Sequence, residues 1–310
     1  MKAWWLRPSV RLLAALLLPF VVPAVITLLI WALPGDPAEI ICPPERCGGT
    51  QMLAERWNLD QGPWHFFVTW MGAAFEGDFG RSWRVQQGED VGVLLREAVP
   101  TSATLLLLTL IPMLSAAAAA AVGWLPARID NLLSGIGTIP AVIFSLLFAA
   151  VVEINYGADS FGEEGTALRM LFGVIVLCLA DGALAGAVTG VRALFAAERS
   201  QRYVGVALLR GERPLSNMLP NVAPALIGQL RARVLHLLSG AVVVEVVLRI
   251  NGIGDLLWLG TLMQDFGVVL AAATVFASFS AVLLAIQAIA EIIVALHVRR
   301  APALAAPVTA

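Results

Sequence analysis

Long apolar stretches separated by shorter polar ones dominate this chain. Six segments hold about 20 or more mostly apolar residues, the length that an α-helix needs to cross a hydrocarbon core of roughly 30 Å. They cover approximately residues 10–33, 100–125, 132–152, 168–192, 222–247 and 268–297. The pattern predicts an all-α polytopic membrane protein with six transmembrane helices.

The apolar segments divide the chain into four regions. We expect an N-terminal region with the first transmembrane helix, an extracytoplasmic loop with short helices, a five-helix core and a cytoplasmic tail, at residues 1–33, 34–99, 100–297 and 298–310. The first segment follows basic residues, as a signal peptide does. It is too long for the apolar part of a signal peptide and lacks a small-x-small cleavage site, so we interpret it as a retained anchor.

Composition and charge support this topology. The chain is 59% hydrophobic and 14% charged, whereas soluble domains have about half apolar and about a quarter charged residues. If the N-terminus is cytoplasmic, the inner connections contain many arginines against only Asp130, Glu198 and Glu212. The positive-inside rule then places both termini in the cytoplasm.

The three cysteines fall in different environments. Cys178 lies within an apolar segment and is interpreted as a small buried side chain. Cys42 and Cys47 lie in the first outer loop, where an oxidising compartment permits a disulfide, and we expect them to form one. Two thiols without a nearby histidine do not favour a zinc site.

The chain has no means of conventional ATP hydrolysis. A P-loop needs a lysine that reaches the β- and γ-phosphates, and the only lysine is Lys2. If transport through this protein consumes ATP, separate chains must supply the energy.

Several blocks resemble the membrane permease subunits of dipeptide and oligopeptide ABC importers, the peptide/nickel family. They are "LPGDPAE" (33–39), "WNLDQGPWHFFVTWMGAAFEGDFGRSW" (57–83), "VPTSATLLL" (99–107), "SGAVVVEVVLRINGIGDLL" (239–257) and "QDFGVVLAA" (264–272). The most specific is the fourth, which is similar to the family's "GGAVVVETVFGYPGLGRLL". The likeness spans most of the chain and implies a type I ABC importer permease fold.

The resemblance also implies partners and a location. It implies a heterodimer with a second permease subunit, two ABC ATPase subunits that bind ATP and Mg²⁺, and an extracytoplasmic substrate-binding protein, all at the inner membrane of a bacterium. This chain itself would be a transport subunit within the lipid bilayer, with no cofactor, metal or nucleic acid bound. Its solute would be a peptide or a similar small molecule; a nickel chelate or a sugar derivative is the alternative.

The loop at 198–216 resembles the family's coupling element, a short cytoplasmic helix that seats in a groove of the ATPase. "ALLRG" (207–211) is similar to "ARAKG" and "RPLSNMLP" (213–220) to "HALRNALLP", but the stretch that usually separates them is absent. Gly211 is expected to break a short helix, and Pro214 to begin the next one. The residues assigned to ATPase coupling are Tyr203, Ala207, Arg210, Gly211, Glu212, Arg213 and Asn217. From the residues alone, a solvated connector explains the loop equally well.

Polar residues inside the apolar segments are candidates for the translocation path, because burying them in hydrocarbon is costly. Gln229, Arg233, His236 and Ser239 follow one another at steps of four, three and three, which places them on one broad face of a helix. Asp181 either contacts the solute or neutralises Arg231 or Arg233. Glu245 lies near the outer end of the fifth segment and completes the set.

A different class of protein remains as an alternative. "GIGD" (252–255) matches the GxGD string of intramembrane aspartyl proteases, in which two aspartates share a proton. In this interpretation Asp255 would be one catalytic aspartate and Asp181 the other. Asp255 stands just beyond the fifth segment, where turn-forming glycines explain the string better.

Overall fold

The computed structural model describes residues 6–41, 50–157 and 162–300. Among these residues the regular structure is helical, with one isolated bridge between Arg81 and Asp90. The helices are α1 (Leu6–Ala32), α2 (Pro37–Ile41), α3 (Thr50–Arg56), α4 (Gly62–Phe75), α5 (Val91–Val122), α6 (Arg128–Ile136), α7 (Ala141–Tyr156), α8 (Glu163–Leu179), α9 (Ala183–Arg199), α10 (Arg202–Leu209), α11 (Pro214–Leu248), α12 (Ile253–Leu262) and α13 (Phe266–Arg300).

The prediction of six spans is confirmed in count when two bent helix pairs each serve as one span. The described residues contain four sufficiently long and apolar stretches, Pro8–Ala32, Val91–Val122, Glu163–Arg199 and Phe266–Val294. The bent pairs are α6 with α7, at an angle of 76°, and α11 with α12, at 68°. The third and fourth expected segments are therefore not continuous helices: the third bends between α6 and α7, and the fourth changes to a 3₁₀ turn at Ala180–Gly182.

The two breaks lie against each other. The N–H of Asp181 donates to the carbonyl of Ile139 at 3.3 Å, and the N–H of Ala141 donates to the Asp181 carboxylate at 3.3 Å. An added Cβ on Gly137 would lie 2.7 Å from the Cα of Gly182, so the two backbones meet without room for a side chain. Each break thereby satisfies backbone groups of the other, as a helix interrupted in a membrane requires.

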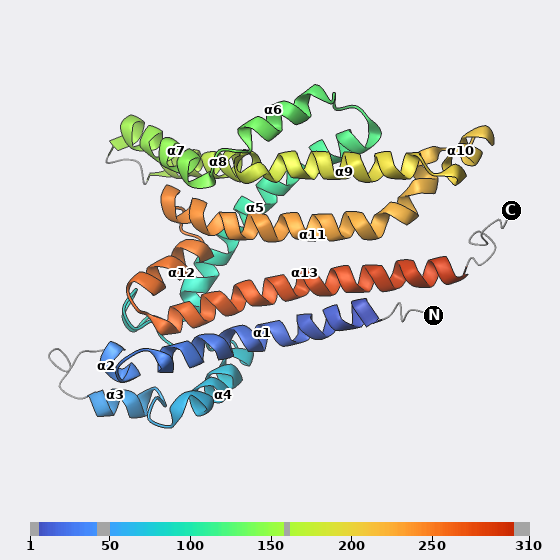
Figure 1. The fold of residues 1–310 in the computed structure, drawn as a ribbon. Helices are drawn as coiled ribbons and strands as arrows, with labels where there is room; N and C mark the ends of the chain where they lie inside the picture. The colour runs from blue at the N-terminus through green and yellow to red at the C-terminus, as the bar shows by residue number, and fades with distance from the viewer. Residues whose placement is uncertain (1–5, 42–49, 158–161, 301–310) are drawn as a thin grey trace.

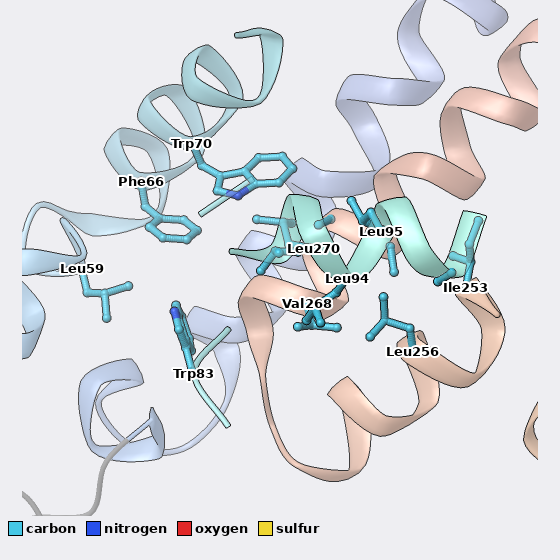
Figure 2. Packing of buried hydrophobic residues seen from close by; sticks show 14 of the residues in the cluster. Leu59, Phe66, Trp70, Trp83, Leu94, Leu95, Ile253, Leu256, Val268 and Leu270 are labelled. Carbon is cyan, nitrogen blue, oxygen red and sulfur yellow. The ribbon is translucent and has the colours of Figure 1, made fainter. Parts of the chain in front are cut away.

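The bundle has three buried clusters along its length. The start of α1, the end of α13 and α10 lie at one end, and α2, α3 and α12 at the other (Figure 1). At the α12 end, aromatic side chains of α4 and of the loop before α5 pack on α5, α12 and α13 (Figure 2). The middle cluster joins α5, α7, α8 and α11. The cluster at the α10 end consists of Ala121, Phe195, Val204, Met218 and Val222.

α1 lies along α13 (Figure 1). Arg11 of α1 forms an ion pair with Glu291 of α13, and the Gln287 amide donates to the same carboxylate at 2.9 Å. Charged groups inside a span are costly unless they are paired. This pair therefore fixes how the first and last helices face each other.

Candidate functional site

The segment between α9 and α11 folds as α10, a tight turn at Gly211 and the start of α11. Gly211 has a φ of +74°, in the left-handed region that favours glycine. Its N–H donates to the Leu208 carbonyl at 3.0 Å, and the N–H of Glu212 donates to the Ala207 carbonyl at 3.0 Å. This pair of bonds is the Schellman pattern that ends a helix. The predicted break at Gly211 and helix start at Pro214 are both confirmed.

α10 presents an apolar face to the outside. Val204 and Ala207 are buried against the cluster at this end of the bundle. Val206, Leu208 and Leu209 are exposed, and Leu209 is 89% exposed. The sequence analysis did not identify Val206, Leu208 and Leu209 as exposed. In a helix this short and apolar, the sequence does not show which side packs against the rest of the protein.

Hydrogen bonds fasten α10 and its turn to both long neighbours. The Tyr203 hydroxyl donates to the Glu198 carboxylate on α9 and accepts from the Asn221 amide on α11 at 2.9 Å. Partial burial, followed by the neighbouring Glu198, raises the pKa of the Tyr203 phenol. The Asn217 amide donates to the Glu212 carboxylate at 2.7 Å. α10 is therefore braced against α9 and α11.

The predicted coupling residues divide between the two sides of this element. Arg210, Gly211, Glu212 and Arg213 are exposed around the turn. The Ala207 side chain is 6% exposed and faces the protein's own core.

The next candidate group lies along α11, beside α9 and the helix break that precedes it. We call Asp181, Gln229, Arg233 and His236 the polar seam. The Arg233 guanidinium lies on Gly186 of α9 so closely that an added Cβ would be 2.3 Å from Nη2. The Gln229 amide lies in the same way on Gly190, where an added Cβ would be 2.3 Å from Oε1. The two glycines are four residues apart on α9, and the two polar residues are four residues apart on the antiparallel α11. The glycines therefore form a flat surface on which the polar side chains lie.

Gln229 and Arg233 line a cavity of about 400 Å³ between α5, α9 and α11. The rest of its wall is apolar and comprises Met113, Leu114, Ala117, Ala118, Ala121, Val122, Ala187, Val191, Phe195, Leu215, Leu219, Leu226, Ile227 and Leu230. A mostly apolar hollow with few polar groups is the usual form of a small-molecule site.

His236 and Asp181 meet at the level of the two helix breaks, where both line a smaller cavity with Gly240 of α11. Asp181 has a φ of +51°. Among the described residues Asp181 makes no ion pair with Arg231 or Arg233. The neutralising role that we considered for Asp181 is therefore wrong for this conformation, because its carboxylate receives the Ala141 amide instead.

Ser239 and Glu245 do not join the seam. Ser239 is exposed, and its hydroxyl donates to the His236 carbonyl at 2.8 Å. Glu245 is 1% exposed and lies farther along α11. Its carboxylate accepts the Ser102 hydroxyl at 2.6 Å and the Gly254 N–H at 2.7 Å, at the N-terminus of α12. A carboxylate is favourable there, so Glu245 holds the α11–α12 bend.

A second buried carboxylate was missed by the sequence analysis. Asp265, between α12 and α13, is fully buried, and one of its oxygens accepts four hydrogen bonds from residues 82–85 at 2.6 to 3.0 Å. Asp265 lies in the quoted block "QDFGVVLAA", and its partners lie at the end of the block "GDFGRSW" and in the two residues after it. Nothing local in either block indicates that they pair.

The geometry does not favour the intramembrane protease. Asp181 lies with His236, whereas Asp255 follows the end of α11 in α12, beyond Glu245. Glu245 lies nine helical positions after His236, a rise of about 13 Å. The two aspartates thus belong to different levels of the bundle.

Of the three cysteines, the structure describes Cys178. Cys178 is a buried free thiol that contacts the Thr109 carbonyl at 3.6 Å, as expected for a small buried side chain. Cys42 and Cys47 lie outside the described residues. Their disulfide stays a prediction.

Comparisons with known proteins agree with the transport interpretation. Residues 119–300, more than half of the chain, match the family described as binding-protein-dependent transport system inner membrane component. The chain is 28% identical over 286 residues to the glutathione transport system permease protein GsiC of Escherichia coli (strain K12), covering 86% of this chain and 90% of the relative. The corresponding protein of Shigella boydii serotype 4 (strain Sb227) gives the same identity and coverage.

Proposed function

Because the chain belongs to the family of binding-protein-dependent transport system inner membrane components, we propose that it forms half of the translocation path of a bacterial ABC importer. In this proposal a second permease subunit completes the path, two ATPase subunits supply the energy, and an extracytoplasmic binding protein delivers the solute. α10 with its turn at Gly211 is the element that contacts the ATPase.

One observation carries the coupling role. α11 has 35 residues, which corresponds to a length of about 52 Å against a hydrocarbon core of about 30 Å. Some of the helix must therefore project from the bilayer, and α10 sits at one of its ends. There α10 leaves Val206, Leu208 and Leu209 exposed, without contact to the protein's own core. An exposed apolar patch next to arginines suits a protein partner better than a solvated connector.

The side of the membrane follows from the same element. ATP-hydrolysing partners are cytoplasmic, so the α10 end faces the cytoplasm. The start of α1 and the end of α13 lie at this end (Figure 1). This arrangement and the arginine distribution support a cytoplasmic location for both termini. The cluster at the α12 end then faces the binding protein.

The proposed mechanism is alternating access. ATP-driven closure of the ATPases moves α10, which Tyr203 and the buried cluster connect to α9 and α11. α11 carries Gln229, Arg233 and His236 of the polar seam, and α9 packs beside them, so a displacement of these helices changes which side of the membrane the seam faces. The relatives named above are glutathione permeases. They support a peptide-like solute over a nickel chelate or a sugar derivative.

Affinity purification tests the proposal. The tagged chain, expressed in its native host and extracted in mild detergent, should carry a second permease and ATPase subunits in stoichiometric amounts, identified by mass spectrometry. Leu209→Gln should reduce ATPase recovery at least about tenfold, because it removes apolar contact area. Leu262→Gln, an exposed leucine of α12 at the other end, is the matched control and should leave recovery unchanged. Purification of a lone chain that cleaves a model peptide would contradict the proposal.

A further inference from the structure

Arg233 is a charged side chain near the middle of the fifth predicted span. Its guanidinium carbon lies so near Gly186 that an added Cβ would be 2.5 Å away. Only a glycine at position 186 leaves room for the guanidinium beside α9. The guanidinium is therefore held flat against that helix, and Arg233 belongs to the wall of the cavity between α5, α9 and α11.

Arg233 and Gln229 both lack a protein partner for their side chains among the described residues. Among the described residues Arg233 makes no ion pair, and no hydrogen bond of its side chain is found. Gln229 Oε1 is buried without a hydrogen-bond partner. A cation and a buried acceptor at this depth are costly unless something pairs with them. They lie one helical turn apart on the same wall, so one ligand can reach both.

The two groups have complementary requirements. A guanidinium binds a carboxylate through parallel hydrogen bonds, whereas an amide oxygen accepts an N–H. The surrounding wall is apolar and offers no competing anion. A ligand that satisfies both groups carries a carboxylate with an N–H beside it.

We propose that Arg233 and Gln229 form the point in the translocation path that contacts a carboxylate and the adjacent N–H of the solute, and that Gly186 and Gly190 position them. Arg233 is thus a specificity-determining residue that favours anionic over cationic solutes. This proposal rests on the proposed function, because it assumes that the cavity belongs to the path. Gly186 and Gly190 act only through the side chains that they support.

Charge-selective labelling tests the role of Arg233. Leu230, a 41% exposed residue of the cavity wall, is replaced by cysteine in a chain whose native cysteines are alanines. The assembled transporter then reacts with sulfonate and trimethylammonium methanethiosulfonates. The ratio of sulfonate to ammonium rates should fall at least about tenfold in Arg233→Gln and persist in Arg233→Lys, since a nearby charge acts on both reagents. An unchanged ratio in Arg233→Gln, or no reaction at position 230 in any nucleotide state, overturns the proposal.

Protection tests the carboxylate contact itself. Triglycine should slow labelling at position 230 more than triglycinamide, which lacks the carboxylate, and Arg233→Gln should abolish the difference. Gly186→Ala should diminish it as well, because its Cβ displaces the guanidinium. Gly135→Ala, where an added Cβ meets nothing within 4 Å, should preserve it. Equal protection by both peptides, or none by triglycine, overturns the proposal. Labelling needs no ATP hydrolysis, so loss of coupling with retained selectivity would count against the proposed function alone.

Discussion

The Ser82 hydroxyl donates a hydrogen bond of 2.6 Å to the carboxylate of Asp265, 183 residues later in the chain. The N–H groups of Trp83, Arg84 and Val85 donate to the same oxygen at 2.8, 2.9 and 3.0 Å. Consecutive N–H groups that converge on one oxygen form a pocket for an anion. The loop before α5 is thereby fixed to the turn before α13, and both are part of the surface that would face the binding protein.

Asp265→Asn should destabilise the protein by about 2 kcal/mol, because charge-assisted hydrogen bonds are lost and an amide N–H can face the donors. The unfolding midpoint in detergent should fall accordingly. Asp60→Asn, at an exposed carboxylate without a hydrogen bond among the described residues, should leave the midpoint unchanged. Equal midpoints for the two variants would show that the contact contributes little.

The bend between α11 and α12 depends on Ser102. Its hydroxyl donates to Glu245 at 2.6 Å and accepts the Ile253 N–H at 2.8 Å. Ser102→Ala should lower the free energy of unfolding by about 2 kcal/mol, since it leaves buried partners unsatisfied. Ser115→Ala, an exposed serine of the same helix whose hydroxyl bonds only to the Ile111 carbonyl, should cost less than about 0.5 kcal/mol. Chemical denaturation measures both, and similar costs would refute the role of Ser102.

The fold class and the number of spans follow from the sequence because bilayer thickness fixes the length of an apolar helix. Gly211 and Pro214 were also predictable, because a left-handed turn and a helix start depend on the residue that occupies them. The helix break at Asp181 was not, since Gly182 is one of many small residues in that apolar segment. The Asp265 contact was equally hidden, because its partners are brought together only by folding.

The support beneath the polar seam shows the same limit. Helical spacing placed Gln229, Arg233 and His236 on one face. The structure places the first two against α9 and His236 beside Asp181 at the helix breaks. That spacing says nothing about which helix faces them. Gly186 and Gly190 were visible only as small residues that permit close packing. Ser239 and Glu245 fell on neighbouring positions, but their backbone and carboxylate contacts lead elsewhere.

Topology follows from the arginine distribution. Reporter domains fused after Arg128, Arg213 and Arg300 should be active as cytoplasmic reporters. Fusions after Glu89 and Glu163 should report the outer compartment, because an odd number of spans precedes each. An inverted result at any of the five positions would contradict the arrangement with six spans and both termini inside.

Cys42 and Cys47 should form a disulfide when the protein is isolated from an oxidising compartment. Mass spectrometry of a non-reduced digest should find the two cysteine peptides joined, and reduction should separate them. Cys178, a buried free thiol, provides the internal control for alkylation after unfolding. Two free thiols at Cys42 and Cys47 would disprove the bond.

The central claim is that α10 and its turn transmit force between ATPase and path, and Gly211 tests it most directly. An added Cβ there meets nothing within 4 Å, so a substitution acts through the φ of +74° alone. Valine strains this conformation by about 1–2 kcal/mol, whereas asparagine adopts it readily. The measurement is the stimulation of ATP hydrolysis by loaded binding protein in the reconstituted transporter. We expect Gly211→Val to reach the membrane and assemble but to lose the stimulation, and Gly211→Asn to retain it. Full stimulation in Gly211→Val would contradict the account and leave the loop a simple connector.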